Sequence, residues 1–440
     1  MVVGEVATSA DVVIIGAGPG GYTAALQCAA GGKEVVLVER DFIGGVCLNV
    51  GCIPSKALIH AATLAHDARS SAAWGITADV HVDLATTHTA IAHVVSQLTT
   101  GVEGLLTRAK VRVVRGSARL SNARRVAIET QSGVEHIEFE HLVVATGSRA
   151  VELSSMPFDG INVLDATAAL ALTVLPLTLT IVGGGYIGVE LGTAFAKLGS
   201  KVTIVEVGSE ILPGMPFNLA RIVRLRLEEL GVAVRLDTTL DRADGLTIVA
   251  VGRRPNTAEL GLEHAHVRLE SNGLIPVDAA RRTSNPHILA IGDVTAGPAL
   301  AHKATAEALV AAATILGRKA AFQPLTIPAV VFSDPEIASV GYTVESAKAA
   351  GVSATAHRLP MRANGRALAA GAPQGSAELV VDETGTIIGA HIASIGASEL
   401  AAEIALAIEM GTTATDLALT IHPHPTLGEV WAEAARALMP

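Results

Sequence analysis

The stretch DVVIIGAGPGG, residues 11–21, decides the fold, because an apolar run ends there in a glycine-rich turn. An alanine-rich segment follows, and a second apolar run, VVLVE, ends at Glu39. This order predicts strand, turn, helix and strand, the arrangement of a dinucleotide-binding unit. Gly16, Gly18 and Gly21 would let the turn close tightly and approach a pyrophosphate, and Glu39 would accept hydrogen bonds from a ribose.

The same signature recurs further along the chain. Residues 180–188, TIVGGGYIG, repeat the strand and turn, and the run VTIVE ends at Glu206. In both copies the acidic residue follows the last glycine by 18 positions. Two complete copies predict two nucleotide-binding units, the second built on Gly183, Gly185, Gly188 and Glu206. Glu206 would repel a ribose 2′-phosphate, and the VGS that follows it offers no arginine, so NAD is preferred over NADP.

Two of the three cysteines, Cys47 and Cys52, lie within GGVCLNVGCIPSK, residues 44–56. Two more ligands nearby would be needed for zinc, so we predict a redox pair and no metal, with an inert buried pair as the alternative. In an ideal helix, Cα atoms five residues apart are separated by about 8–9 Å, whereas a disulfide needs less than about 7 Å. We therefore expect the backbone around Gly51–Pro54 to depart from a regular helix if the two sulfurs are bonded.

Near the C-terminus, residues 422–429 read HPHPTLGE. Histidine exchanges protons near neutral pH, and an imidazolium beside a thiol favours the thiolate. We predict that His424 is an acid–base group oriented by Glu429. Thr426 and Glu429 also fit a helix capping box, and His422 fits a structural role at least as well.

The composition argues against a nucleic-acid-binding protein and against a membrane-spanning one. The net charge of −10 leaves no basic stripe for nucleic acid, and no apolar run is long enough to predict a membrane span. The first 21 residues contain no Lys or Arg, which argues against a signal or transit peptide and favours a cytoplasmic location. The length predicts about three domains. Strands are expected at 111–114, 126–129, 137–139, 142–146, 248–251, 288–291, 378–381 and 387–392, and helices at about 83–108 and 397–410.

Together these motifs resemble the flavoprotein disulfide reductases, and in particular the members that oxidise dihydrolipoamide. The similarity covers about residues 11–437 and rests on GGVCLNVGCIPSKAL (44–58), GGGYIGVELG (183–192), AVGRRPN (250–256), AIGD (290–293) and HPHPTLGE (422–429). Such members usually have Ala and Ser where this chain has Pro423 and Gly428. The family's mercuric reductases carry a C-terminal cysteine pair, whereas this chain has no cysteine beyond Cys52.

The resemblance implies an α/β fold with two Rossmann-like FAD/NAD(P)-binding domains and a C-terminal α+β dimerisation domain. The expected limits are an FAD-binding domain at 1–148, a shortened NAD-binding domain at 149–253, a central domain that completes the FAD site at 254–325, and an interface domain at 326–440.

The implied activity is oxidation of dihydrolipoamide to lipoamide through a Cys47–Cys52 disulfide and FAD, with reduction of NAD⁺ to NADH, within 2-oxo acid dehydrogenase complexes. Cys47 would exchange with the dithiol and Cys52 would face the flavin. His424, with Glu429, would accept the proton across the two-fold axis of a homodimer. The substrate would be the dihydrolipoyl groups of an acyltransferase subunit. Another NADH-dependent disulfide reductase and a weakly active docked subunit stay open as alternatives.

The implied cofactor contacts extend beyond the glycine turns. Lys56 would approach the flavin and pair with Glu190, and Asp293 would bind the ribitol chain. The other expected contacts are Ala118, Thr146, Gly147, Ser148, Gly252, Ala301 and His302.

One departure from the family lies between Val232 and Gly252, where the family usually has a longer stretch with an extra β-meander. Here Asp237–Thr247 is all that connects the two strands. We expect this domain to be less stable, or to gain cover from a partner, while it keeps its NAD site.

Overall fold

The computed structural model describes residues 8–243 and 245–439. They form two compact units. The first runs through Ala57, Ala85–Val151 and Gly252–Gln323, and the second contains Leu58–Leu84, Glu152–Val251 and Pro324–Pro440. The four predicted domain limits stay a prediction. The expectation that residues 1–21 hold no targeting segment falls partly on residues 1–7, outside the described residues.

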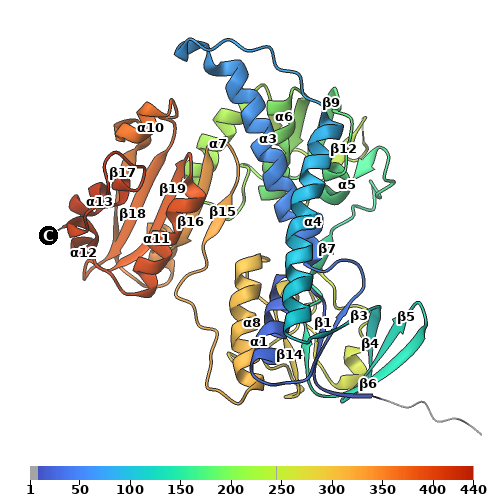
Figure 1. Ribbon diagram of the computed structural model, residues 1–440. Coiled ribbons are helices and arrows are strands. Elements are labelled where there is room, and N and C mark those ends of the chain that lie inside the picture. Colours follow the sequence, from blue (N-terminus) through green and yellow to red (C-terminus); the bar gives the residue numbers. More distant parts are fainter. Residues whose placement is uncertain (1–7, 244, 440) are drawn as a thin grey trace, which may run out of the picture. The chain divides into compact units, whose positions relative to one another are not determined.

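The first unit is built on a sheet whose core strands are parallel (Figure 1). Strands β3, β2, β1, β6 and β14 lie side by side in that order and run parallel to one another. A meander of β4, β5 and β6 extends the sheet. The bounds are β1 Thr8–Ile15, β2 Val35–Glu39, β3 Arg112–Arg115, β4 Ser117–Asn122, β5 Arg125–Thr130, β6 Gly133–Val144 and β14 Ile288–Ala290.

Helices α1 (Pro19–Ala30) and α8 (Ala301–Ile315) pack against each other in the first unit (Figure 1). A Cβ on Gly20 of α1 would lie 3.2 Å from the carbonyl oxygen of Ala304, so glycine permits this close approach. Helix α4 (Leu84–Arg108) matches the predicted 83–108 segment closely. The short elements of this unit are α2 (Gly45–Asn49), β7 (Ser148–Ala150), β13 (Arg253–Pro255), η2 (Leu262–Ala265) and η3 (Gly292–Val294).

The second unit contains a five-stranded parallel sheet in the order β11, β10, β9, β12, β8. Its strands are β8 Val163–Leu164, β9 Thr178–Val182, β10 Lys201–Val205, β11 Ala233–Arg235 and β12 Thr247–Val249. Helices α5 (Ala166–Leu170), α6 (Tyr186–Leu198) and α7 (Phe217–Glu229) connect them. The link from β11 to β12 crosses two strands without a helix or strand among its described residues.

The short link is covered by the chain itself. Leu240 and Ala243 of the link pack with Met156, which is 2% exposed, against Val182 and Val249 of the sheet. The chain therefore supplies a small apolar cluster in place of the expected meander.

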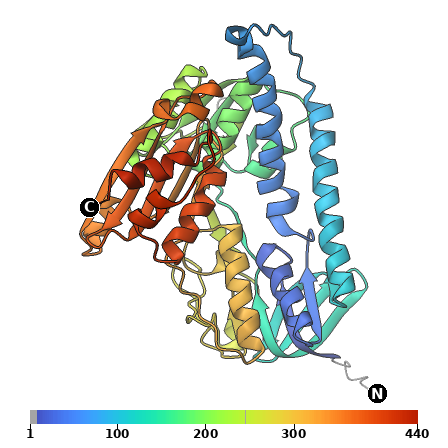
Figure 2. The ribbon, with the colours of Figure 1, turned by 60° about the vertical axis from the view of Figure 1, so that its left-hand side comes forward.

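The C-terminal part of the second unit is an antiparallel sheet with helices on one face (Figure 2). Trp431, Ile404 and Leu379 lie in its core, and each is at most 1% exposed. This arrangement confirms the predicted α+β fold. Its elements are β15 Ala329–Val331, β16 Glu336–Gly341, β17 Ala354–Pro360, β18 Ser376–Asp382, β19 Ile387–Ser394, α9 Val344–Ala349, η4 Met361–Ala363, α10 Gly365–Ala369, α11 Ala397–Glu409, α12 Ala414–Leu419 and α13 Glu429–Arg436.

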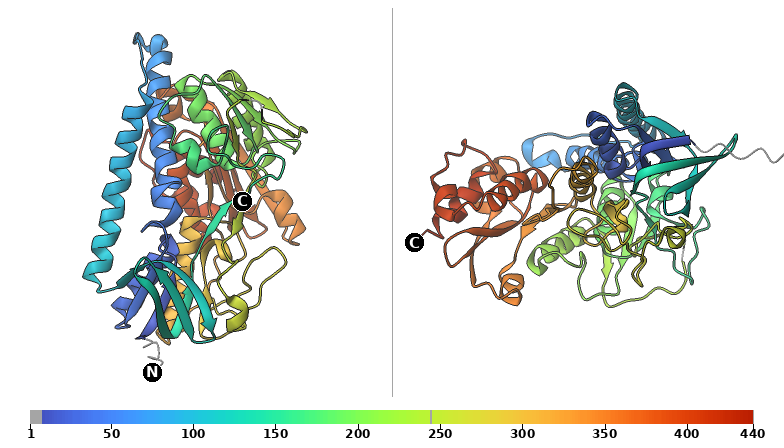
Figure 3. Two further views of the ribbon diagram at one scale, coloured as in Figure 1. Left: turned by 90° about the vertical axis from the view of Figure 1, so that its right-hand side faces the viewer. Right: turned by 90° about the horizontal axis from the view of Figure 1, so that it is seen from below.

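The second unit also contains most of α3 (Cys52–Ser70), which continues into the short helix η1 (Ser71–Trp74) (Figure 3). By length and composition alone, the helical stretch Gly45–Trp74 could cross a membrane, with 28% of its most apolar window buried. The sequence predicted no span. The stretch is broken at Val50, where φ is −139°, and it carries Lys56 and Arg69. Length and composition are weak evidence by themselves, so the absence of a span stays a prediction.

Candidate active site

The glycine turn after β1 leaves bare backbone at the start of α1. Gly16 has a φ of +103°, and a Cβ on Gly21 would overlap the carbonyl oxygen of Gly16. At Gly18, nothing lies within 4 Å of where a Cβ would stand. Gly18 is the N-cap of α1 and has no side chain to satisfy the first N–H groups. Exposed N–H groups at a helix N-terminus fit the pyrophosphate of a dinucleotide.

Glu39 ties this turn to the end of β2. Its Oε2 accepts a hydrogen bond from the Ala17 N–H at 2.6 Å, and its Oε1 accepts one from the Asp41 N–H at 2.8 Å. The Glu39 residue is 9% exposed. The carboxylate therefore sets the spacing between the turn and the strand on which a ribose would lie.

Parallel pairing brings several predicted residues to one edge of the first sheet. Strands β1, β6 and β14 are in register and end together, so the segments that follow them meet there. Ser148 Oγ donates a hydrogen bond to Asp293 Oδ2 at 2.5 Å. Thr146 and Gly147 precede Ser148 in the same turn, and Gly147 has a φ of +68°. The structure thus places Thr146, Gly147, Ser148 and Asp293 together.

The other predicted cofactor residues of the first unit lie around this edge. Ala118 is in β4, just after Gly116, whose N–H donates to the carbonyl oxygen of Glu39 at 2.9 Å. Ala301 and His302 are the first residues of α8. Gly252 precedes β13, which pairs with β7, and its carbonyl oxygen accepts from the Val151 N–H at 3.0 Å.

The cysteine pair lies where the helix is interrupted. Helix α2 ends at Asn49, Val50 has a non-helical φ of −139°, and α3 begins at Cys52. The chain thus departs from a regular helix between the two cysteines, just before Pro54, while residues from Cys52 onward are helical. The two sulfurs are not bonded in this structure, so the departure expected at Gly51–Pro54 in the disulfide form stays a prediction. Pro54 occupies the first turn of α3, where its missing N–H costs no hydrogen bond.

Cys47 and Cys52 are not joined in a disulfide, and their thiols contact each other. The hydrogen bond to Cys52 raises the pKa of Cys47, burial raises it further, and Lys56 opposes both effects. Asp293 also acts on Cys47, so the pair, Lys56 and Asp293 share one region of the first unit. Tyr22 of α1 lies close enough for Cys47 to add to the effect of burial, and both raise the pKa of its phenol.

The third cysteine behaves differently. Cys28 is fully buried in α1, and burial raises the pKa of its thiol to about 12. It therefore stays protonated and unreactive at neutral pH.

The second glycine turn repeats the first in detail. Gly183 has a φ of +109°, and a Cβ on Gly188 would overlap the carbonyl oxygen of Gly183. At Gly185 the same space is open. Glu206 Oε2 accepts from the Gly184 N–H at 2.6 Å, as Glu39 does from Ala17. The bare turns, the helix N-termini and the buried carboxylates of both units fit a bound dinucleotide.

Glu190 lies in α6 and is 4% exposed. Its Oε1 accepts a hydrogen bond from the Phe332 N–H at 3.0 Å. Lys56 and Glu190 belong to different units, so their predicted pairing stays a prediction.

The predicted acid–base pair is formed in the second unit. Glu429 Oε1 lies 2.9 Å from His424 Nδ1, and Glu429 Oε2 accepts from the Thr426 N–H at 2.8 Å. The Thr426 N–H and then His424 lower the pKa of Glu429, so the carboxylate stays charged. Helix α13 begins at Glu429 with Gly428 as its N-cap, so Thr426 does not cap this helix; its hydroxyl donates to the Pro423 carbonyl oxygen. The His424 side chain is 79% exposed.

Sequence patterns missed the residues that anchor the turn after β6. Arg253 Nε donates to Ser148 Oγ at 2.8 Å, and Thr146 Oγ1 donates to the carbonyl oxygen of Asn256 at 2.6 Å. Both anchors belong to the AVGRRPN motif, but their partners lie more than 100 residues away. Spacing along the chain therefore could not reveal them.

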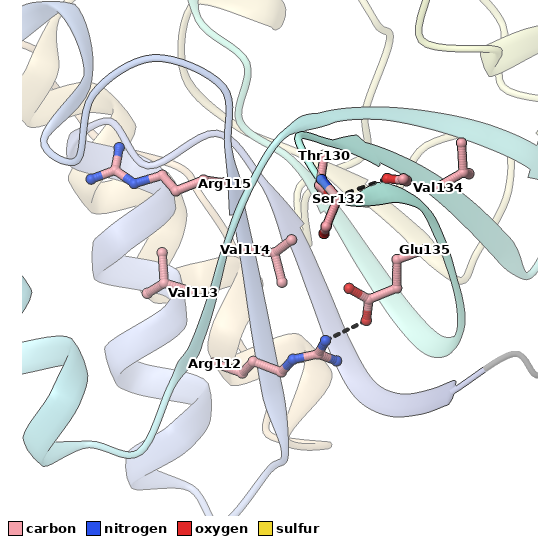
Figure 4. A pocket seen from close by; sticks show the side chains of 9 residues that line it. Arg112, Val113, Val114, Arg115, Thr130, Ser132, Val134 and Glu135 are labelled. Carbon is pink, nitrogen blue, oxygen red and sulfur yellow. Dashed lines mark hydrogen bonds and ion pairs between the residues drawn. The ribbon is translucent and has the colours of Figure 1, made fainter.

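A shallow depression lies along β3 and the β5–β6 turn (Figure 4). Its charged groups are already paired, Arg112 with Glu135 and Arg115 with Glu103. It therefore does not compete with the glycine turns as a nucleotide site.

Known proteins share these features along the whole chain. Residues 10–308 match the pyridine nucleotide-disulphide oxidoreductase family model, and residues 327–435 match the dimerisation domain of that family. A dihydrolipoyl dehydrogenase of Geobacillus stearothermophilus is 47% identical over 100% of this chain and 98% of that protein. One of Bacillus subtilis (strain 168) is 45% identical over 99% of this chain and 97% of that protein.

A solved structure agrees. The crystal structure of LpdA from Mycobacterium tuberculosis superposes with a TM-score of 0.92 and 29% identity, and the match covers 98% of this chain and 100% of that one. The sequence matches, the two glycine turns and the cysteine pair lead to one conclusion. The chain belongs to the pyridine nucleotide-disulphide oxidoreductase family, whose enzymes use FAD and NAD.

Proposed function

We propose that this chain is a dihydrolipoamide dehydrogenase, which oxidises dihydrolipoamide to lipoamide and reduces NAD⁺ to NADH. The observation that carries the proposal is the contact between the thiols of Cys47 and Cys52, beside Lys56 and Asp293 at the cofactor edge of the first sheet. The dihydrolipoyl dehydrogenases among its relatives match over nearly their full length.

In the oxidised enzyme, a substrate thiolate attacks Cys47 Sγ in the Cys47–Cys52 disulfide. A mixed disulfide forms with Cys47, and Cys52 leaves as a thiolate. The second substrate thiol, deprotonated by His424, attacks its partner sulfur, which closes lipoamide and releases Cys47. The substrate has then lost two electrons and two protons, and the cysteine pair is reduced. When bound, FAD supplies the redox chemistry that links this dithiol to NAD⁺.

The thiol geometry supports this division of roles. In the reduced pair the Cys47 thiol hydrogen-bonds to Cys52, and this contact raises the pKa of Cys47. The two sulfurs therefore act as one dithiol, in which we assign Cys47 to the substrate and Cys52 to the flavin.

His424 supports the role of base by its geometry. Nδ1 faces the carboxylate of Glu429, which holds that proton in place and leaves Nε2 to accept one from a substrate thiol. The ring is 79% exposed, so a substrate can reach it.

We assign the cofactors by the same logic. FAD binds the first turn through Gly16, Gly18, Gly21 and Glu39, with Lys56, Ala118, Thr146, Gly147, Ser148, Gly252, Asp293, Ala301 and His302 around it. NAD binds the second turn through Gly183, Gly185, Gly188 and Glu206, and Glu190 pairs with Lys56. The open backbone at Gly18 and Gly185 supports both assignments.

We also propose that the enzyme works as a homodimer in which each subunit lends His424 to the other. Residues 327–435 match a dimerisation domain, and apolar side chains beside His424 are uncovered. Leu419 is 73% exposed and Ile421 is 94% exposed, which is costly for an isolated subunit in water.

The acyltransferase partner and the cytoplasmic location complete the proposal. Residues 324–440 carry twelve acidic and five basic side chains, an excess that suits a basic docking surface on the partner. A sequence with three cysteines and one close thiol pair fits a reducing compartment.

The decisive experiment measures NADH formation from dihydrolipoamide and NAD⁺ by the purified flavin-loaded chain. Cys47→Ser and Cys52→Ser are each expected to lower the rate by about 10³-fold or more, because no disulfide can form. Cys28→Ala is the matched control and should keep the rate. Activity with other disulfides but none with lipoamide would instead assign the chain to another NADH-dependent disulfide reductase.

A further inference from the structure

The segment HPHP points its two histidines to different surroundings. The His424 side chain is 79% exposed, whereas the His422 side chain is 8% exposed and faces α11. The proposed mechanism uses His424 and leaves His422 without a role.

Both ring nitrogens of His422 face oxygen atoms that can only accept hydrogen bonds. Nε2 lies 2.8 Å from Glu403 Oε1, and Nδ1 lies 3.0 Å from the carbonyl oxygen of Thr420. A neutral ring carries one N–H and can satisfy one of these contacts, whereas an imidazolium satisfies both. The ring is thus held between Glu403 and the backbone of its own segment.

The pair links the histidine segment to a rigid part of the domain. Glu403 lies on α11, and its neighbours Ile404 and Ala407 are buried in the core. One end of the segment is thus fixed to α11 at His422. The other end is fixed at Thr426, whose carbonyl oxygen accepts from Asn364 Nδ2 at 3.1 Å.

The chain has a glycine next to this pair. A Cβ on Gly428 would lie 3.7 Å from Glu403 Oε2 and 3.9 Å from His422 Cδ2, which is ordinary contact distance. The dihydrolipoamide-oxidising members that the chain resembles usually have serine there, and a hydroxyl could reach the same carboxylate. In this chain Gly428 has no hydroxyl, and among the described residues it is His422 that contacts the Glu403 carboxylate here.

We propose that His422 and Glu403 are positioning residues that hold His424 in place for proton transfer. The inference rests on the proposed function, because His424 must be the base. The Glu403–His422 contact fixes the backbone two residues before His424, and Glu429 fixes the ring itself. Without the first contact, His424 keeps its partner but loses its position. A displacement of about 1 Å at a base can lower a rate by about 100-fold.

The test compares two half-reactions of the flavin-loaded enzyme by rapid mixing. Electrons from dihydrolipoamide enter through the cysteine pair and need His424 as base, whereas electrons from NADH enter without His424. The change in the flavin absorbance spectrum would report each half-reaction. We expect His422→Ala to slow the dihydrolipoamide half-reaction by about 10- to 100-fold, with the NADH half-reaction unchanged. His422→Gln keeps one N–H toward Glu403 and should recover the rate to within about fivefold of wild type. Glu403→Gln should fall between the two.

Two exposed residues supply matched controls. His81→Ala, with a side chain 93% exposed, and Glu399→Gln, one turn before Glu403 on α11, should match wild type. A wild-type dihydrolipoamide rate in His422→Ala would overturn the inference alone. An equal loss in both half-reactions, or no recovery in His422→Gln, would also overturn it, because a general folding defect would explain the loss. A wild-type enzyme that NADH reduces but dihydrolipoamide does not would overturn the proposed function and the inference together.

Discussion

The two nucleotide-binding regions have nearly the same turn but different cover. Each turn has a first glycine with φ near +100°, a last glycine pressed on a carbonyl oxygen, and a glutamate that accepts from the turn at 2.6 Å. The first region extends its sheet with the β4–β5–β6 meander and packs α1 on α8. The second replaces a meander with a short link over Met156. The two turns thus share the same geometry and hydrogen bonds, whereas the elements that pack around the two sheets differ.

The first prediction concerns a glycine-to-alanine substitution at the last glycine of the first turn. Gly21→Ala sets a methyl group against the Gly16 carbonyl oxygen, which costs about 3 kcal/mol and opens the turn. We expect the purified protein to carry little flavin, measured as the absorbance ratio of flavin to protein. Gly101→Ala is the control, because nothing lies within 4 Å of its Cβ. Full flavin content in Gly21→Ala would show that this turn is not the FAD site.

Gly188→Ala is the equivalent substitution at the last glycine of the second turn. We expect NAD⁺ to bind about 100-fold more weakly, since the cost of overpacking is about 1–3 kcal/mol and falls on the turn itself. The flavin should stay bound, and its absorbance spectrum should still change when dihydrolipoamide reduces the cysteine pair. Calorimetric titration with NAD⁺ and flavin absorbance measure the two effects. If Gly188→Ala lost as much flavin as Gly21→Ala, the result would contradict the assignment of FAD to the first turn and NAD to the second.

The apolar cluster around Met156 should limit the stability of the second nucleotide-binding region. Met156→Ala removes a side chain that is 2% exposed and should lower the free energy of unfolding by about 2–5 kcal/mol. Hydrogen exchange should show lost protection in β9 and β12, with the first sheet unaffected. Met439→Ala, at a site 43% exposed, is the control. Equal loss of protection in both sheets would mean that the two regions unfold as one.

The smallest expected effect concerns acid stability of the second unit. Burial alone would raise the pKa of Asp334, but Lys197 at 3.0 Å and Arg226 at 3.3 Å outweigh it and lower the pKa below its ordinary value of 3.8. A lowered pKa stabilises the fold at pH values above the ordinary one, and the gain disappears as the pH falls through the lowered value.

We expect wild type to lose about 1–2 kcal/mol more than Asp334→Asn on acidification from pH 5 to pH 2. Denaturant unfolding at several pH values measures the difference. Asp79→Asn, with a side chain 93% exposed, is the control. Parallel pH curves for wild type and Asp334→Asn would show that this ion pair does not set the acid limit.

Much of the fold could be predicted because its signals are local. The two glycine turns, the strands that precede them and the helix at 84–108 follow from periodicity over a few residues. The break in the helix between the cysteines follows from bond geometry. The cover over the short link could not be predicted, because Met156 and Leu240 approach each other only after the sheet has formed.

The candidate site divides in the same way. Cys47, Cys52, His424 and Glu429 stand in motifs whose spacing indicates their chemistry. Arg253 and Asn256, which hold the turn after β6, act on partners more than 100 residues away. Glu403 and His422 are 19 residues apart, and helix α12 lies between them in the chain. Nothing in the pattern of either segment indicates the contact.

The sequence by itself determined which residue types could carry the chemistry, because thiols, an imidazole and bare glycine turns have few substitutes. Tertiary structure decided which of these side chains are fixed by a partner, exposed to solvent or buried. It buried Cys28 and left Cys47 beside Cys52, and it turned His422 inward and His424 outward. The physical reason is that reactivity depends on desolvation and on neighbouring charge, and both arise from contacts between distant parts of the chain.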